Sequence, residues 1–342
     1  MSRLIVIMLA ILWPVAAAAD GRSIQFGVQI APENASYEEI VATWKLLDDL
    51  GYDSAWLNDH FIPTMGDKDQ PHFDAWTMLA ALAPSTQRIR MGILVSGNTY
   101  RHPAVLAKMA TTVDHISHGR LNFGVGAGWE EFEHRAYGIP FYSAQERVER
   151  LGEALEVITQ LWGRSRPTFN GKYYQLFEAP FAPKPVQQPH PPIVVGGQGK
   201  KWLMPIVARY ADEWNVAVGV TPAGMRKRLE IIREECKRIN RSPCVTGVSV
   251  FLPLVNITNV PLAETATRLA ARVVAGKKAA RSVLAGSVDD IKGRIQEYID
   301  AGATSVIITT RPSLNHDLMR RFATEIMPAF QQRPPAAAGP PA

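Results

Sequence analysis

The sequence predicts one α/β domain of the (β/α)8 barrel class, a TIM barrel, spanning residues 24–330. Strand-like and helix-like segments alternate along this whole span, and several strand-like segments run directly into polar or glycine-rich loops. The length of 342 residues would allow two domains, but barrels of this class commonly reach it as one. The pattern alone leaves an open, doubly wound sheet as the alternative.

Eight apolar segments are the predicted strands. In chain order they cover residues 24–30, 54–57, 91–95, 121–125, 193–195, 213–218, 245–255 and 306–310. The predicted helices cover residues 36–50, 74–82, 103–118, 143–162, 200–211, 222–239, 262–275, 288–301 and 316–329. This alternation indicates a parallel sheet, since parallel strands need a long connection that returns to the same end.

Capping residues set the helix boundaries. Ser36 is a predicted N-cap, and Gly51 ends the same helix. Pro103 suits a first helical position, because the N–H group that it lacks would have no partner there. Ser143 and Glu146 have the spacing of a capping box.

The chain between the fourth predicted helix and the fifth strand is predicted to be an insertion. Asn170-Gly171 favours a hairpin turn, because its turn type matches the twist of paired strands. The proline-rich stretch at 180–192 is a stiff connector rather than an element.

Composition limits the class of function. The net charge is +5 and the basic residues are scattered, so nucleic acid is not an expected partner. No zinc-type spacing of ligands occurs, so no metal site is expected. Cys236 and Cys244 are the only cysteines; they either pair in an oxidising compartment or are one buried thiol and one loop thiol.

Both ends of the chain are predicted to lie outside the barrel. Residues 1–19 have an early Arg3, an apolar run and small residues before Asp20, the layout of a cleaved secretory signal. A retained anchor or a start codon assigned too early are the alternatives. A true signal predicts an exported or periplasmic protein, and otherwise a cytoplasmic one. The tail at 331–342 is rich in proline and alanine and is predicted to be disordered.

The loops after the second to fifth strands hold the candidate site residues, because barrel enzymes build their sites at the carboxyl ends of the strands. Asp59 and His60 follow the second strand. A histidine there can exchange a proton near neutral pH, and an adjacent carboxylate can orient it. His60 is therefore the first catalytic candidate, with Asp59 as its predicted partner.

The loops after the third and fourth strands are candidate cofactor contacts. Ser96 and Gly97 begin the first of them, and Asn98 and Thr99 add side-chain donors and acceptors. The second loop contains Gly126 and Gly128 in a pattern that is a weak phosphate signal, followed by Trp129 as a stacking surface.

The loop after the fifth strand is the predicted phosphate site. It reads Gly196-Gly197-Gln198-Gly199-Lys200 and precedes a predicted helix. Consecutive backbone N–H groups at a helix N-terminus attract anions, and Lys200 adds positive charge.

Four stretches resemble the luciferase-like oxidoreductases, the superfamily of bacterial luciferase, alkanesulfonate monooxygenase and the coenzyme F420 dehydrogenases. They read GYDSAWLNDHF at 51–61, RIRMGILVSGNTYRHPAVLAKMATTVDHISHGRLNFGVGAGW at 88–129, PPIVVGGQGKKWLMPIVARYADEWN at 191–215 and AGSVDDIKGRIQEYIDAGATSVIIT at 285–309. The likeness extends from Ile24 to about Met327 and is greatest to the branch of probable F420-dependent oxidoreductases.

This resemblance implies a barrel of the bacterial luciferase type, with the insertion as a roof over the site. In deazaflavin members the histidine that matches His60 lies against the reactive face of the ring, and a non-proline cis peptide forms a bulge near Val95. Some sugar-phosphate dehydrogenases of the family carry a glutamate where this chain has Trp129, which counts against that substrate.

The cofactor implied by the resemblance is F420, with FMN as the alternative. Long-chain FMN monooxygenases carry a histidine and a tyrosine at the positions of Ala144 and Val148, which favours F420 here. The implied function is hydride transfer or monooxygenation of a small organic substrate. The alternatives are an FMN-dependent monooxygenase of the alkanesulfonate type, supplied by a separate reductase, and a non-catalytic flavin-binding barrel. The family also implies a homodimer.

Overall fold

The computed structural model of the protein describes residues 23–259, 282–310 and 314–331. The predicted signal at 1–19, the predicted helix at 262–275 and the tail beyond residue 331 lie outside these ranges. No helix within the described ranges is long and apolar enough to cross a membrane.

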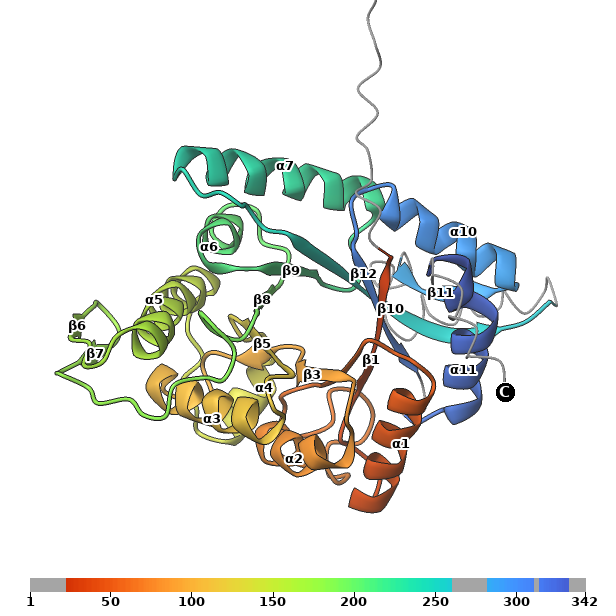
Figure 1. Cartoon of the computed structure of the whole chain (residues 1–342), viewed down its shortest axis with the longest axis horizontal. Coiled ribbons are helices and arrows are strands. Elements are labelled where there is room, and N and C mark those ends of the chain that lie inside the picture. The colour runs from red at the N-terminus through yellow and green to blue at the C-terminus, as the bar shows by residue number, and fades with distance from the viewer. Residues whose placement is uncertain (1–22, 260–281, 311–313, 332–342) are drawn as a thin grey trace, which may run out of the picture.

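Eight parallel strands form a closed barrel (Figure 1). They are β1 (Gln25–Ile30), β2 (Ser54–Leu57), β3 (Arg90–Ile93), β5 (Leu121–Gly126), β8 (Ile193–Gly196), β9 (Glu213–Val216), β10 (Gly247–Ile257) and β12 (Ser305–Thr310). The ring closes because β12 pairs with both β10 and β1. This closure confirms the predicted (β/α)8 barrel and excludes the open sheet.

Two short strands lie beside the ring, and two more form a separate hairpin. β4 (Ser96–Gly97) continues the line of β3 and pairs with the end of β5, so the third predicted strand is interrupted by a bulge. β11 (Leu284–Gly286) pairs with β10 and was not predicted. β6 (Phe169–Asn170) and β7 (Gln175–Leu176) are antiparallel to each other.

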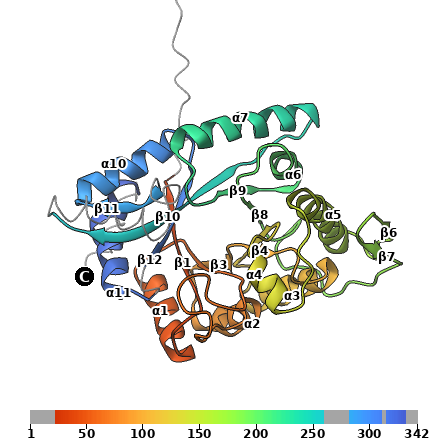
Figure 2. The same ribbon diagram turned by 180° about the vertical axis from the view of Figure 1, so that it is seen from behind.

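Except for the short α4, which lies in the loop after β5, the helices cover the outside of the barrel (Figures 1 and 2). They are α1 (Tyr37–Asp49), α2 (Ala75–Leu82), α3 (Pro103–Ile116), α4 (Glu131–Ala136), α5 (Ala144–Gly163), α6 (Leu203–Tyr210), α7 (Pro222–Arg238), α10 (Val288–Ile299) and α11 (His316–Arg321). Three differ from the predictions. α4 was not predicted, α6 begins three residues after Lys200, and the last predicted helix continues beyond α11 as a wider turn over Phe322–Ile326 and a tighter one over Met327–Ala329.

The predicted caps explain where the helices begin. Ser36 and Glu39 form a reciprocal capping box at the start of α1, and Pro103 is the first residue of α3. Ser143 caps α5 by accepting a hydrogen bond from the Glu146 N–H at 3.2 Å. The Glu146 carboxylate pairs with Arg150 one turn later, so the reciprocal half of that box is not formed.

A tryptophan fills part of the barrel interior. Trp56 on β2 is buried together with Leu94, and its indole N–H donates to the Ser54 hydroxyl at 2.8 Å. An added Cβ on Gly27 would lie 2.4 Å from that hydroxyl, and one on Gly92 would lie 2.7 Å from the indole ring. Glycine on the neighbouring strands therefore makes room for one large side chain, which is how a small barrel reaches interior packing density.

The segment between α5 and β8 contains the predicted hairpin, and both views place it at the outer edge beside α5 (Figures 1 and 2). Its turn spans four residues, Gly171 to Tyr174, rather than the two of a tight Asn-Gly turn. The Glu153 carboxylate of α5 accepts hydrogen bonds from three backbone N–H groups of this turn. That the segment is an inserted roof over the active site stays a prediction.

A disulfide joins Cys236 near the end of α7 to Cys244, with a Cα–Cα distance of 5.7 Å. The sequence left open whether the two cysteines pair, and in the structure they do.

Candidate active site

The carboxyl ends of β2, β4 and β5 bring four candidate side chains together. His60 follows β2, Asn98 and Thr99 follow β4, and Trp129 follows β5. The imidazole of His60 and the indole of Trp129 meet edge to face, with ring centroids 5.6 Å apart. The sequence predicted each of these residues separately, and the barrel places them at one end.

His60 is oriented by Glu133, a residue of α4. The His60 Nδ1 lies 2.9 Å from Glu133 Oε2, and the carboxylate also accepts the Tyr100 hydroxyl and the Phe61 backbone N–H. Because a carboxylate can only accept, Nδ1 carries the proton and Nε2 is left to exchange one. Nε2 forms no hydrogen bond with any other described residue.

Burial and hydrogen bonding act in opposite directions on Glu133. Burial raises the pKa of this carboxyl, but the hydrogen bonds from His60, Phe61 and Tyr100 outweigh it and hold the pKa below its usual value. Burial and the adjacent carboxylate raise the pKa of Tyr100, so the phenol stays protonated and donates. The site therefore contains an ionised, fully buried carboxylate that is hydrogen-bonded to His60.

Asp59 does not orient His60, and that prediction is wrong. Its carboxylate accepts from the Ser96 hydroxyl at 2.5 Å and from Arg101 at 2.7 Å, away from the imidazole. Ser96 of β4 and Arg101 after it hold the Asp59 carboxylate, whereas Glu133 of α4 holds His60, so different elements fix these two neighbouring side chains. Arg101 also binds Asp74 at 2.6 Å, so Asp59 belongs to a buried ionic network that supports the loop.

The hydroxyl groups of Ser96 and Thr99 both donate hydrogen bonds to other residues of the protein. Ser96 donates to Asp59 and accepts from the Trp76 indole at 2.9 Å. His134 donates from Nδ1 to the Glu130 carbonyl at 2.6 Å, so its Nε2 accepts from Thr99 at 2.7 Å. Neither hydroxyl is therefore free to donate to a cofactor.

Asn98 keeps an open acceptor. Its Nδ2 donates to the Tyr174 hydroxyl at 3.3 Å, which connects the hairpin to this loop. Its Oδ1 is buried and has no hydrogen-bond partner among the described residues. A buried carbonyl oxygen without a partner is costly, so this atom is suited to a donor on a bound molecule.

The side chain of Val95 explains why two of the predicted site residues, Gly126 and Gly196, are glycines. The Leu94–Val95 peptide is cis and lies at the bulge expected from the family resemblance. A Cβ added to Gly196 would lie 2.8 Å from Val95 Cγ1, and one added to Gly126 would lie 2.7 Å from Cγ2. These glycines therefore accommodate the valine side chain itself, whatever else approaches them.

Gly97 and Gly128 are also glycines because neighbouring side chains leave no room for a Cβ atom. A Cβ on Gly97 would lie 2.5 Å from the Tyr100 ring, and one on Gly128 would lie 2.7 Å from the Thr99 hydroxyl. Gly128 also has φ +77°, a conformation that favours glycine.

Only part of the predicted phosphate loop after β8 has backbone N–H groups that are free to bind a phosphate. The Gly197 N–H donates to the Asn215 carbonyl at 3.2 Å, and the Gln198 carbonyl accepts from Arg228 at 2.8 Å. The N–H groups of residues 198–201 form no hydrogen bond with a described residue, and Lys200 is exposed. The stretch of N–H groups that could receive an anion is therefore shorter than predicted and lies before α6 rather than at its first residue.

Sequence reasoning missed Glu133, Tyr100 and Arg101. Of the acidic residues in this loop, Glu131 pairs with Arg135 on the surface and Glu133 is the one that contacts His60. The sequence could have revealed Glu133 only through the short segment Glu131–Ala136. This segment forms the helix α4, and Glu133 lies on its buried side.

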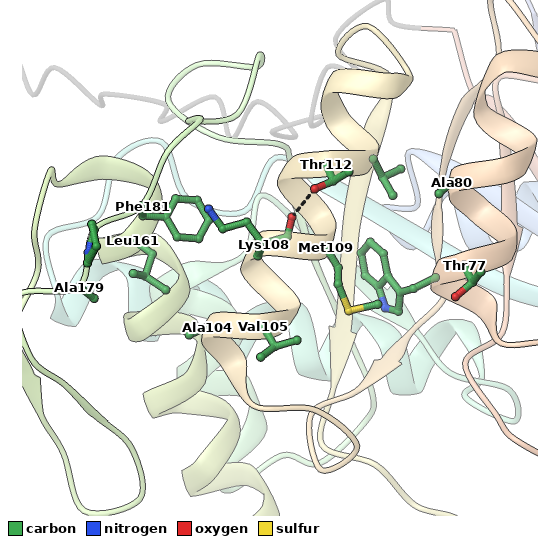
Figure 3. Close-up of a pocket in the computed structure, with 13 residues that line it drawn as sticks. Thr77, Ala80, Ala104, Val105, Lys108, Met109, Thr112, Leu161, Ala179 and Phe181 are labelled. Carbon is green, nitrogen blue, oxygen red and sulfur yellow. Dashed lines mark hydrogen bonds between the residues drawn. The ribbon is translucent and has the colours of Figure 1, made fainter.

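An apolar groove of about 610 Å³ lies elsewhere, on the outside of the barrel. It runs between α2, α3 and residues 179–181, and Figure 3 shows Lys108 beside Phe181 at one end of it. None of the predicted site residues lines this groove. Within the described ranges no cluster of histidine, cysteine and acidic residues suited to a metal ion is found.

A closed parallel barrel with an oriented histidine at the carboxyl ends of its strands defines an enzyme of the TIM-barrel class. A model of the family described as luciferase-like monooxygenase matches residues 21–259, and the chain belongs to that family. This confirms the resemblance seen in the sequence.

Several proteins that are similar to this chain are named as dehydrogenases or monooxygenases. An F420-dependent glucose-6-phosphate dehydrogenase of Microbacterium testaceum is 27% identical over 336 residues, which cover 91% of this chain and 98% of the relative. An F420-dependent secondary alcohol dehydrogenase, solved with an F420–acetone adduct, is 21% identical with a TM-score of 0.78, covering 90% of this chain and 99% of that one. The EDTA monooxygenase of Chelativorans is 17% identical with a TM-score of 0.73, covering 91% and 94%. The two solved structures show a shared fold.

Proposed function

We propose that this protein is an F420-dependent oxidoreductase that transfers hydride to or from a small organic substrate. The observation that carries the proposal is the His60–Glu133 pair, which leaves Nε2 of a barrel-mouth histidine open to a substrate. The relative that covers nearly the whole chain is named as F420-dependent, which supports the same cofactor here.

The residues present suit a deazaflavin. The orphan Oδ1 of Asn98 can accept the N–H of a pyrimidine edge. The unpartnered backbone N–H groups at 198–201, with Lys200 beside them, can receive its phosphate. When bound, the deazaflavin supplies the hydride acceptor or donor.

The protein's own contribution is proton transfer and placement. His60 Nε2 takes the proton of a substrate hydroxyl during oxidation, or gives one to a carbonyl oxygen during reduction. Glu133 holds Nδ1–H, so the imidazole keeps the tautomer and direction that this exchange requires. Trp129 forms one side of the space next to the imidazole.

FMN-dependent monooxygenation is the second candidate function. It is supported by fold alone, since solved structures of monooxygenases share this barrel. Ala144 begins α5 and, like Val148, offers no side-chain hydrogen bond to a flavin. A barrel that binds flavin without turnover is the third reading and lacks a use for the buried His60–Glu133 pair.

Two further predictions belong to this proposal. We propose a homodimer, for which the apolar groove between α2 and α3 is a suitable described surface, and light scattering of the purified protein tests it. We also propose export, supported by the Cys236–Cys244 disulfide, since such bonds persist in oxidising compartments. A separate reductase is expected only if the cofactor is consumed in its reduced form.

The test is a titration of the full-length protein with F420, FMN and reduced FMN, followed by fluorescence and absorbance. The expected result is saturable binding of F420 alone, weakened by Lys200→Ala and by Asn98→Leu. Arg209→Ala, an exposed cation change outside the proposed phosphate loop, is the matched control. Preferential binding of reduced FMN would move the proposal to monooxygenation, and binding of none of the three cofactors would overturn the proposal.

A further inference from the structure

Trp129 is unusually exposed for a large aromatic side chain beside a buried acid–base group. Its exposed fraction is 61%, whereas His60, against which it packs edge to face, is 9% exposed. Exposed apolar side chains next to a reactive group mark candidate ligand contacts. The open part of the indole is therefore available to a molecule that also reaches His60.

The side chains next to this position are aromatic as well. Phe61, which directly follows His60, packs against Tyr100 with ring centroids 4.9 Å apart and against Tyr137 at 5.0 Å. Tyr137 is 55% exposed, so this cluster, like Trp129, presents an aromatic ring to the solvent.

The charged side chains next to His60 are bonded to other groups of the protein, and carboxylates outnumber cations among them: Glu133, Asp59 and Asp74 face one guanidinium, that of Arg101. Glu133 accepts from His60, Tyr100 and Phe61, and Asp59 is held by Arg101, which also binds Asp74. On α4, the exposed Glu131 pairs with Arg135 at 3.1 Å. The described surroundings of His60 thus offer a substrate an apolar wall and one proton-exchanging nitrogen.

We propose that Trp129 determines substrate class, and that the substrate is a small uncharged apolar alcohol, aldehyde or ketone rather than a sugar phosphate. The inference rests on the proposed function for the redox step but makes its own claim about binding. His60 Nε2 would meet the oxygen of the substrate, and the indole would cover its alkyl or aryl part. A phosphate ester would bring a dianion against this apolar wall and beside the buried carboxylates Glu133 and Asp59, which costs desolvation energy and adds like-charge repulsion. Arg147, the cation next to this loop, already donates to the Gly128 and Tyr142 carbonyls.

The experiment measures binding, because hydride transfer needs one reduced partner and neither oxidised F420 nor a ketone can supply the hydride. The full-length protein is saturated with oxidised F420 and titrated calorimetrically with the methyl ketones from acetone to 2-hexanone, and with glucose 6-phosphate. The expected Kd falls about fourfold for each added methylene group, the change that complete burial of a methylene gives. Glucose 6-phosphate is expected not to bind.

Variants assign the effect to one side chain. Trp129→Ala should make Kd nearly independent of ketone length, and Trp129→Phe should retain most of the dependence. Phe177→Ala is the matched control, because Phe177 is 84% exposed and lies beside β7 in the hairpin segment, so the whole series should be unchanged. Thermal unfolding of each variant checks that the fold is kept.

The outcomes separate this inference from the proposed function. A Kd that does not depend on ketone length in the wild type, or tighter binding of glucose 6-phosphate than of 2-hexanone, overturns the inference. The titrations are repeated without F420. A length dependence that Trp129→Ala removes supports the inference even if F420 itself fails to bind, in which case only the proposed cofactor is wrong.

Discussion

Glu133 Oε2 lies 2.9 Å from His60 Nδ1 although the two residues are 73 positions apart in the sequence. The contact exists because α4 follows β5 and β5 lies two strands from β2 around the barrel, so both loops open at the same end. A fully buried carboxylate with three donors and no exposed surface is a fixed part of the structure, and it determines which nitrogen of His60 faces the site.

Replacing His60 tests whether it exchanges the proton. His60→Ala should leave the F420 dissociation constant within a few-fold and lower turnover by about 10²-fold or more, the usual contribution of a general acid–base group. Fluorescence titration and steady-state kinetics measure the two quantities. An equal loss of binding and turnover would show that His60 supports the loop instead.

Replacing Glu133 tests whether this carboxylate positions the imidazole of His60. Glu133→Gln should lower kcat by about tenfold or more with little change in KM, and should change the pH profile of kcat, because the amide can also present an N–H to Nδ1 and favour the wrong tautomer. Glu131→Gln is the control, since Glu131 lies on the same helix but pairs with Arg135 at the surface. A pH profile identical to that of the wild type would refute the positioning role.

The lowered pKa of Glu133 predicts that the stability of the folded protein changes with pH. The pKa of Glu133 is lowered in the folded state from 4.5, so its contribution to stability is complete above about pH 4.5 and is lost as the pH falls through the lower, folded value. The difference in unfolding free energy between wild type and Glu133→Gln should therefore shrink below pH 4.5. Urea unfolding at several pH values measures it, and a constant difference would contradict the assignment.

His72 should make the protein less stable in mild acid. Burial, reinforced by the nearby His60, lowers the pKa of His72 from 6.5 to about 4. Between these values the unfolded chain binds a proton that the folded protein does not, so stability falls as the pH drops, by up to about 3 kcal/mol. His72→Asn should reduce that loss. His118→Asn is the control, because His118 is exposed and its φ of 53° suits asparagine.

Gly196 and Val95 should be coupled. Gly196→Ala places a Cβ 2.8 Å from Val95 Cγ1 and should destabilise the fold by about 1–3 kcal/mol through overpacking. In the Val95→Ala background the same change should cost at least about 1 kcal/mol less. Denaturant unfolding of the four proteins measures this. Strictly additive effects would mean that Gly196 is small for another reason.

The disulfide should contribute to stability. Cys236 and Cys244 close a loop with a sequence separation of 8, for which chain entropy gives about 2.5 kcal/mol. The double change to serine should lower the unfolding free energy by about that amount. Thiol titration of the denatured, unreduced wild type should detect no free cysteine, and two free thiols would contradict the pairing.

The sequence by itself determined the local elements. Alternating apolar segments with capping residues such as Ser36 and Pro103 specify strands and helices through nearby contacts, and the structure has them at those places. It also placed His60, Asn98 and Trp129 at strand ends, because the position of a loop follows from the elements on either side of it.

The tertiary structure alone decided the partners of those residues. His60 is bound by Glu133 rather than by its neighbour Asp59, and Gly126 and Gly196 are small because Val95 packs against both. Neither fact is local in the sequence. Each depends on which strands are neighbours in the closed barrel and on which direction a side chain takes as it leaves its strand, and only the folded chain sets those two quantities.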